Sequence, residues 1–201
     1  IVDQTGDVVA RGKSFDQDLV IADLDVAAVG RARQGERRAR PLSPRVAALV
    51  DRVVVRVPAR KSSSIAVPAM ESPLDRLEEA YRALVLGVRD YVRKNGFKRV
   101  VIGLSGGIDS ALTAVIAVDA VGADNVLGVF MPSPYTSRVS REDVADLAQR
   151  LRIQVDTLSI TTTFKSYLRA LSKPFSGHRP DTTEENLQAR IRGNLLMAYS
   201  N

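Results

Sequence analysis

Val100-Val101-Ile102-Gly103-Leu104-Ser105-Gly106-Gly107-Ile108-Asp109-Ser110 is the stretch that decides the fold of this chain. Its first five residues are apolar and largely β-branched, which predicts a short, buried parallel strand over 100–104. The Ala-rich pattern from Ala111 to Val121 predicts a helix that follows at once. A strand, a glycine turn and a helix N-terminus together form an anion site, because glycines admit a ligand close to the backbone and unpaired N–H groups favour negative charge.

The turn is not a Walker A loop, since no Gly-Lys-Ser/Thr sequence follows it. A Gly-Gly turn in front of a helix can also be an ordinary tight connection. Here two hydroxyl groups, of Ser105 and Ser110, flank the turn, and Asp109 enters the helix where a metal ion bound to phosphate would lie. These side chains favour a phosphate-binding loop.

Ser105 to Ser110 resembles the SGGxDS loop of the PP-loop ATP pyrophosphatases. A wider set of motifs is similar to the glutamine-dependent NAD synthetases: 103–110, Met131-Pro132-Ser133-Pro134-Tyr135-Thr136-Ser137 and Glu185-Asn186-Leu187-Gln188-Ala189-Arg190. The likeness spans about residues 74–201, and the last motif selects this family over its relatives.

The resemblance implies an α/β fold with a doubly wound parallel sheet, of the adenine nucleotide alpha hydrolase type. It implies deamido-NAD binding by Asn186 and Arg190, and Mg²⁺ binding by Asp109. It also implies ATP binding by Gly103, Leu104, Ser105, Gly106, Gly107, Ile108, Asp109 and Ser110. From the residues alone, Asn186 and Arg190 share a helix face with Gly193, and that face suits either carboxylate or pyrophosphate recognition or plain solvent exposure.

The implied reaction has two steps. The nicotinate carboxylate of deamido-NAD attacks the α-phosphate of ATP, and ammonia from glutamine then displaces AMP. The family's glutaminase triad of Glu, Lys and Cys is expected upstream of Ile1, so no catalytic residue is assigned here. A further Lys and an acidic ligand are expected beyond Asn201. With no initiator Met and an end inside a helical pattern, we expect a partial piece of a longer protein.

Three regions are predicted. Residues 1–25 resemble the β-rich tail of a nitrilase-like glutaminase domain, with a hairpin in 2–11 and a strand over 19–25. Residues 26–73 are a Pro-rich interdomain linker with a possible strand at Val53–Val55. Residues 74–201 are the first part of the synthetase domain.

The net charge of +6 is concentrated in one stretch. Between Val26 and Lys61 ten Lys and Arg residues face two acidic ones, which gives +8 and leaves about −2 for the remainder. No aromatic residue lies between Phe15 and Tyr81 to stack on a base, so a solvated linker or an arm against an acidic surface is favoured over nucleic-acid binding.

The synthetase region reads as alternating helices and strands. Helices are predicted over 74–95, with one apolar stripe, over 143–151, capped by Ser140, and over 161–171. A last helix is predicted to begin with a capping box of Thr182 and Glu185. Strands are predicted over 125–131 and 153–158. The loop 132–137 either donates hydroxyl groups to a ligand or is a plain proline turn, and His178 reads as a surface residue.

The chain has no cysteine, which excludes disulfides and thiolate sites within it. No run of 18 apolar residues predicts a membrane span, and no signal peptide is visible, so we expect a cytoplasmic protein. The resemblance implies homo-oligomers, and the lack of aromatic residues in the basic stretch argues against a nucleic-acid partner. Two alternatives stay open: another PP-loop enzyme that adenylates a different acceptor, and a non-catalytic nucleotide-binding or assembly fragment.

Overall fold

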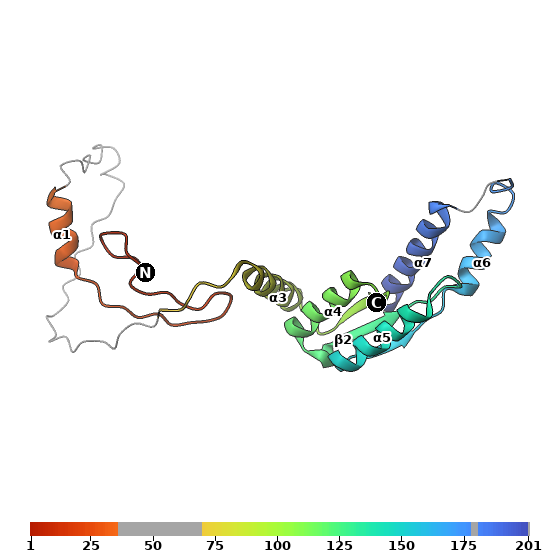
Figure 1. Cartoon of the computed structure of the whole chain (residues 1–201), viewed down its shortest axis with the longest axis horizontal. Helices are drawn as coiled ribbons and strands as arrows, with labels where there is room; N and C mark the ends of the chain where they lie inside the picture. The colour runs from red at the N-terminus through yellow and green to blue at the C-terminus, as the bar shows by residue number, and fades with distance from the viewer. Residues whose placement is uncertain (36–69, 178–180, 201) are drawn as a thin grey trace. The chain divides into compact units, whose positions relative to one another are not determined.

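A computed structural model describes residues 1–35, 70–177 and 181–200 of the chain. These residues form two compact units, Ile1–Asp75 and Arg76–Asn201 (Figure 1). The predicted strand at Val53–Val55, most of the Arg-rich stretch and His178 lie outside the described residues. No helix in the described ranges is long and apolar enough to cross a bilayer.

The first unit has little regular structure among its described residues. Val2 and Val8 form an antiparallel bridge, which confirms the predicted hairpin, and Arg11 bridges Met70. The predicted strand over 19–25 is wrong, because this segment pairs with no strand among the described residues. The Asp18 carboxylate instead accepts the N–H groups of residues 13 and 19.

A helix that the sequence analysis did not predict, α1 (Val26–Gly35), opens the presumed linker. The carboxylate of Asp25 caps it by accepting the N–H of Ala28 at 3.0 Å. This bond, helped by the ion pair with Arg31, holds the pKa of Asp25 below its ordinary value.

The second unit is built on a three-stranded parallel sheet with strand order β1-β2-β3. The strands are β1 (Val100–Leu104), β2 (Val126–Phe130) and β3 (Gln154–Thr157), each within or equal to its predicted range. Val100 pairs with Val126, and Leu127 pairs with Gln154. All three strands therefore end at the same edge of the sheet, which is where open α/β sheets bind ligands.

Helices cover both faces of the sheet, as the predicted doubly wound class requires. On one face α4 (Ile108–Val121) and α5 (Arg138–Leu151) pack over an apolar cluster. On the other, α6 (Thr161–Ala170) and α7 (Thr182–Ser200) cover a second cluster around Phe164, which is 1% exposed. Figure 1 shows these last two helices side by side.

Three helices begin earlier than predicted, and in two of them a side-chain cap sets the start. The helix α4 begins at Ile108 rather than Ala111, directly after Gly107. The helix α5 begins at Arg138, because the Ser137 hydroxyl, and not that of Ser140, accepts the capping N–H. The helix α7 is capped one residue before the predicted box. Asp181 accepts the N–H of residue 183, and the carboxylate of residue 184 returns a bond to the N–H of Asp181.

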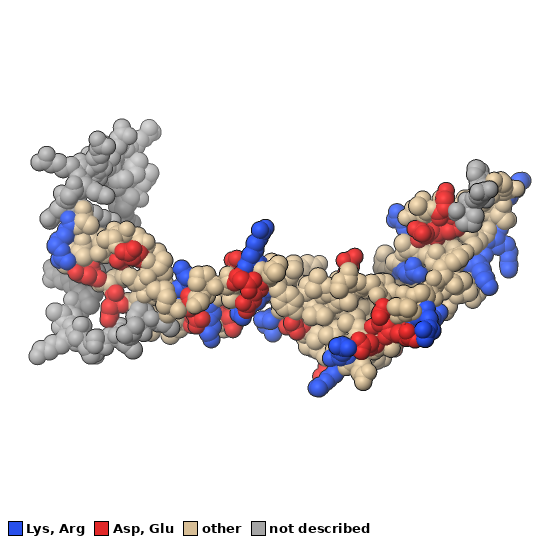
Figure 2. Space-filling model, viewed as in Figure 1, with Lys and Arg blue, Asp and Glu red and all other residues tan. Residues whose placement is uncertain are grey.

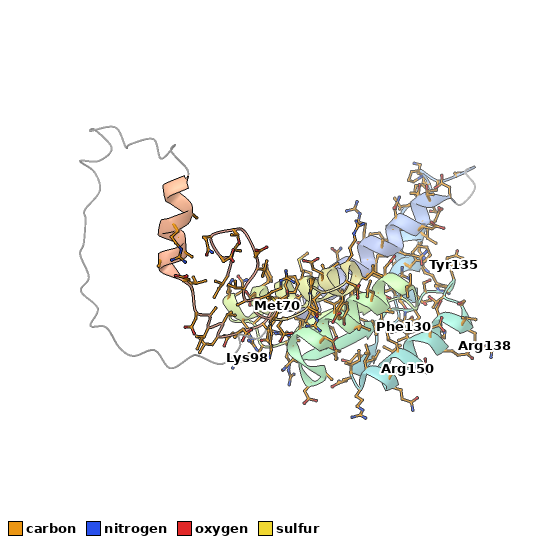
Figure 3. All side chains as sticks on the ribbon, turned by 60° about the vertical axis from the view of Figure 1, so that its left-hand side comes forward. Met70, Lys98, Phe130, Tyr135, Arg138 and Arg150 are labelled. Carbon is orange, nitrogen blue, oxygen red and sulfur yellow. The ribbon has the colours of Figure 1, made fainter. Side chains whose placement is uncertain are left out.

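The outer face of α5 is a solvated, charged surface. Two ion pairs at helical spacing, Arg138 with Glu142 and Arg150 with Asp146, lie along it. Figure 2 shows positive and negative side chains interleaved over this part of the molecule, and Figure 3 places the two arginines toward opposite ends of the helix. Such exposed pairs contribute about 0.3–0.5 kcal/mol each, so α5 is held mainly by its buried side.

The helix α3 (Arg76–Lys94) confirms the predicted first helix of this region and packs on α4. The phenol of Tyr81 donates to the carboxylate of Asp119, and this hydrogen bond raises the pKa of Tyr81 to about 12.

We expect this bond to stabilise the second unit below pH 10 and to be lost as the pH rises through 12. A raised tyrosine pKa means that the folded state retains its proton longer than the unfolded state does. The Tyr81→Phe variant should therefore lose less thermal stability than the parent protein between pH 10 and 12. Thermal unfolding followed by circular dichroism at several pH values measures this, and parallel curves for the two proteins would contradict the assignment.

Candidate functional site

The loop between β1 and α4 is closed by its own two serines. The hydroxyl of Ser110 donates to the carbonyl of Gly107 at 2.9 Å and accepts the N–H of Ser105 at 3.2 Å. The hydroxyl of Ser105 lies 3.0 Å from that of Ser110 and accepts the N–H of Gly107. Both hydroxyls therefore form hydrogen bonds within the loop. This leaves the backbone N–H groups, rather than the serine hydroxyls, as the groups available to a ligand.

Position 106 requires glycine for two reasons, its backbone conformation and the closeness of a neighbouring helix. Its φ of +83° lies in the left-handed region that favours glycine. A Cβ atom there would lie 2.7 Å from both the Cα and the carbonyl oxygen of Ser140. The loop therefore rests directly on the first turn of α5, and only glycine allows this approach.

The N-terminus of α4 opens onto this loop without a side-chain cap. Gly107 is the N-cap residue and offers no side chain to the first N–H groups of the helix. These groups and the helix dipole favour an anion such as phosphate. Asp109 lies in this first turn, is exposed, and has no ion pair or side-chain hydrogen bond among the described residues.

A cavity of about 410 Å³ lies at the carboxyl ends of β1 and β2. Ser105, from the loop between β1 and α4 (the phosphate-type loop, residues 105–110), lines this cavity, and residues of α7 line another side of it. It is lined by Gly103, Leu104, Ser105, Phe130, Met131, Thr136, Ala189, Arg192, Gly193 and Leu196. The lining is mostly apolar with a few polar groups, which is usual for small-molecule sites.

Gly103 sets the distance between β1 and α7. A Cβ at this position would come within 2.9 Å of a methyl group of Leu196. In contrast, the side chain of Leu104 belongs to the core under α4, and that of Ile108 is exposed to solvent. Of the residues predicted to bind ATP, these two therefore have only backbone atoms to offer at the loop.

Arg192 is the residue of this site that the sequence analysis missed. Its Nε donates to the carbonyl of Met131 at 3.1 Å, and the guanidinium also lies 3.5 Å from the Gln188 amide oxygen. Burial lowers the pKa of Arg192, yet an arginine stays protonated in proteins. The signal available in the sequence was its position four residues after Gln188, on the face that also carries the apolar Ile191 and Leu195.

The loop after β2 is a rigid turn, with one of its hydroxyl groups at the cavity. Buried Ser133 donates its N–H to the Thr136 hydroxyl, and its own hydroxyl accepts the N–H of Tyr135. The Tyr135 ring packs edge-on against Phe164, with the ring centres 6.1 Å apart. Figure 3 labels Phe130, which ends β2, and Tyr135, which lies within this turn. Of the loop's four hydroxyl residues, Ser133, Tyr135, Thr136 and Ser137, which were the predicted donors, only Thr136 lines the cavity.

Asn186 and Arg190 are both exposed on α7. They lie on one helix face with Gly193, as predicted, but of these three residues only Gly193 lines the cavity, together with Ala189 and Arg192. The structure therefore does not bring the Asn186–Arg190 pair into the cavity together with the phosphate-type loop.

A single Mg²⁺ ion bound together with phosphate fits the donors present. Within the described residues no group of three or more His, Cys, Asp or Glu side chains is placed to hold a metal. Mg²⁺ is commonly held by one or two carboxylates while phosphate oxygens and waters complete the shell. The exposed carboxylate of Asp109, beside a phosphate-type loop, supplies one such ligand.

Comparison with known proteins gives consistent matches. The NAD synthase family model matches residues 80–201. The glutamine-dependent NAD(+) synthetase of Thermotoga maritima is 47% identical over the whole chain, and that of Rhodobacter capsulatus is 56% identical over 68% of it. The chain spans 34% and 25% of the lengths of these relatives.

Solved structures give the same result. A glutamine-dependent NAD+ synthetase from Acinetobacter baumannii, in complex with ADP, is 47% identical over 67% of this chain and 26% of its own, with a TM-score of 0.65. An NMN synthetase from Francisella tularensis is 30% identical over 61% of this chain and 49% of its own, with a TM-score of 0.55. The parallel sheet, the glycine loop and the family match agree, and the chain belongs to the NAD synthase family.

Proposed function

We propose that the protein carrying this chain converts deamido-NAD to NAD with ATP, using ammonia released from glutamine. The uncapped glycine loop beside the cavity carries the proposal, because it offers backbone donors for phosphates next to a pocket of nucleoside size. The similarity to glutamine-dependent synthetases, one of them in complex with ADP, supports ATP as the nucleotide.

In the first step the nicotinate carboxylate oxygen attacks the α-phosphorus of ATP, and the bond to pyrophosphate breaks. The free N–H groups of the α4 N-terminus face the leaving pyrophosphate, where negative charge grows, and positioned donors are most effective there. Asp109 would hold Mg²⁺, which neutralises part of that charge when bound. In the second step ammonia attacks the acyl carbon, AMP leaves, and the nitrogen loses a proton.

The cavity would hold the adenosine part of ATP. Its apolar lining from Phe130, Met131 and Leu196 suits a purine ring, and Thr136 and Arg192 provide polar groups at its side. Arg192 would also keep α7 docked on the end of β2 through its bond to Met131. We assign Asn186 and Arg190 to deamido-NAD on the strength of the family motif, outside this cavity.

The remaining expectations become part of the proposal. Residues 1–25 would be the end of a nitrilase-like glutaminase domain, residues 26–73 the interdomain linker, and residues 74–201 the first part of the synthetase domain. The alignment of all 201 residues with part of the Thermotoga maritima protein supports placing the three regions in one protein of this kind. We further propose a homo-oligomer in the cytoplasm, with no nucleic-acid partner.

A substrate matrix tests the proposal. The complete gene product that carries this chain is assayed for NAD with deamido-NAD, ATP, Mg²⁺ and either glutamine or ammonium, each omitted in turn. We expect NAD and one AMP per turnover only when an acceptor, ATP and a nitrogen source are present together.

The same assay with nicotinate mononucleotide as acceptor tests a second candidate, which the likeness to an NMN synthetase suggests. A preference for the mononucleotide would replace the first proposal. ATP binding without turnover on either acceptor would favour the non-catalytic alternative.

A further inference from the structure

The first turn of α5 carries a positive charge that has no acidic partner on its own helix. Arg138 and Arg141 both lie in this turn, and no acidic residue does. Arg138 is paired with Glu142 at 3.0 Å. None of the residues three or four positions from Arg141 is acidic, and this arginine forms no ion pair within the described part of the chain. Its charge is therefore left over by the packing of α5.

A cation at this end of a helix is unfavourable unless an anion lies near it. The free N–H groups make the N-terminus the positive end of the helix dipole, so an arginine there is destabilised and a bound anion is stabilised. The helix dipole thus gives no reason for Arg141 at this position. A bound phosphate group would give one, because the guanidinium and the helix end both attract it.

The side chain of Arg141 lies over a ring that lines the cavity. Its Cζ atom is 5.8 Å from the centre of the Phe130 ring, which is within the range of a cation–π contact. Phe130 ends β2, is 6% exposed and contributes to the cavity lining. The guanidinium forms no hydrogen bond to any residue that the structure describes, so its N–H donors remain available for a ligand.

The phosphate-type loop touches the residue next to Arg141. A Cβ atom on Gly106 would lie 2.7 Å from the Cα and the carbonyl oxygen of Ser140, so the loop and the first turn of α5 meet backbone to backbone. Ser105 of this loop and Phe130, beneath Arg141, line the same cavity. Arg141 therefore lies beside both the loop and the cavity.

We propose that Arg141 binds the phosphate chain of ATP at its pyrophosphate end, from the side of α5. This inference rests on the proposed function and adds a cation to the nucleotide site. The groups assigned to the phosphates so far are neutral N–H donors and the acidic Asp109. Arg192, the other arginine of the site, is bonded to the carbonyl of Met131 on the side of α7. A guanidinium on the side of α5 supplies charge-assisted hydrogen bonds to the phosphate oxygens.

Equilibrium binding of nucleotides that differ in phosphate number tests the proposal. The complete gene product and its Arg141→Gln variant are titrated with ATP and with AMP by calorimetry, with Mg²⁺ and without deamido-NAD. Glutamine removes the charge and keeps a polar side chain. We expect the affinity for ATP to fall by about tenfold or more, because hydrogen bonds to charged groups are lost. The affinity for AMP, which lacks the pyrophosphate end, should change by less than about twofold, well under the loss for ATP.

Arg138→Gln is the matched control. It makes the same change of charge in the same turn, but Arg138 is paired with Glu142 and its side chain is 84% exposed. We expect its affinity for ATP to stay within about twofold of the parent, as for an exposed ion pair. Equal weakening in both variants would assign the effect to the general charge of this surface and overturn the contact. Equal loss of ATP and AMP affinity in Arg141→Gln would mean a purely structural role through Phe130, and that also overturns the inference.

NAD formation measured on the same proteins separates this inference from the proposed function. In Arg141→Gln the KM for ATP should rise while the KM for deamido-NAD stays the same. A parent that makes NAD, with unchanged ATP affinity in Arg141→Gln, would overturn the role of Arg141 alone. A parent that binds ATP and makes no NAD would overturn the proposed function, and the titrations would still decide the role of Arg141. A parent that binds no ATP would overturn both.

Discussion

The Gly106→Ala variant is expected to lose ATP-dependent activity by about a hundredfold or more, since a shift of about 1 Å at a reacting centre has effects of this size. The added methyl group would lie 2.7 Å from two backbone atoms of Ser140, which cannot rotate away as a side-chain end could. The left-handed backbone adds about 1 kcal/mol of strain for alanine. The loop must therefore move away from α5, and its N–H groups no longer point at the position of the phosphate.

Gly107→Ala is the matched control for that variant. It adds the same methyl group one residue later, where φ is −91° and the nearest atom is the Ser105 hydroxyl at 3.3 Å. We expect a several-fold loss at most. Steady-state kinetics with ATP varied, together with thermal unfolding, compare the two. Equal activity of the two variants would show that the Gly106–Ser140 contact does not set the loop geometry.

The Asp109→Asn variant is expected to reduce kcat by about a thousandfold, which corresponds to the several kcal/mol that a metal ion supplies in phosphoryl-type chemistry. Folding should be nearly unchanged, because the carboxylate is exposed and has no partner among the described residues. The loss of a negative charge in the first turn of α4 costs about 0.3–1 kcal/mol at most.

The metal role of Asp109 has a readout besides activity. Mn²⁺ binding in the presence of a non-hydrolysable ATP analogue, followed by electron paramagnetic resonance, should weaken in Asp109→Asn and remain as in the parent in Asp124→Asn. Asp124 is also exposed but lies at the opposite edge of the sheet, before β2. Unchanged Mn²⁺ affinity in the first variant would remove Asp109 from the metal site.

Much of the second unit followed from local patterns. The β1 and β2 strands are apolar runs with few alternatives, and α3 has an apolar side and a glycine stop. Helix starts were less predictable, because several serine, threonine and aspartate residues near each start can cap. Which of them caps depends on the path of the preceding loop, as Ser137 and Asp181 show.

In the candidate site, too, some residues could be predicted from the sequence and others could not. The glycine loop and Asp109 were visible as a contiguous motif, since strand, turn and helix N-terminus are neighbours in the chain. Arg192 was not visible, because its partner Met131 is 61 residues away. The same distance effect concealed the contact between Gly106 and Ser140, which explains why that position requires glycine.

By itself, the sequence determined the parallel α/β class, the phosphate-type loop and the family resemblance, because these depend on periodicity and on residues adjacent in the chain. Only the tertiary structure decided that the hydroxyls of Ser105 and Ser110 bond to the loop itself and that Arg192, rather than Arg190, lines the cavity. It also decided which side of α3 stays exposed. Each of these depends on which face of a helix meets the sheet, and packing between distant segments sets that face.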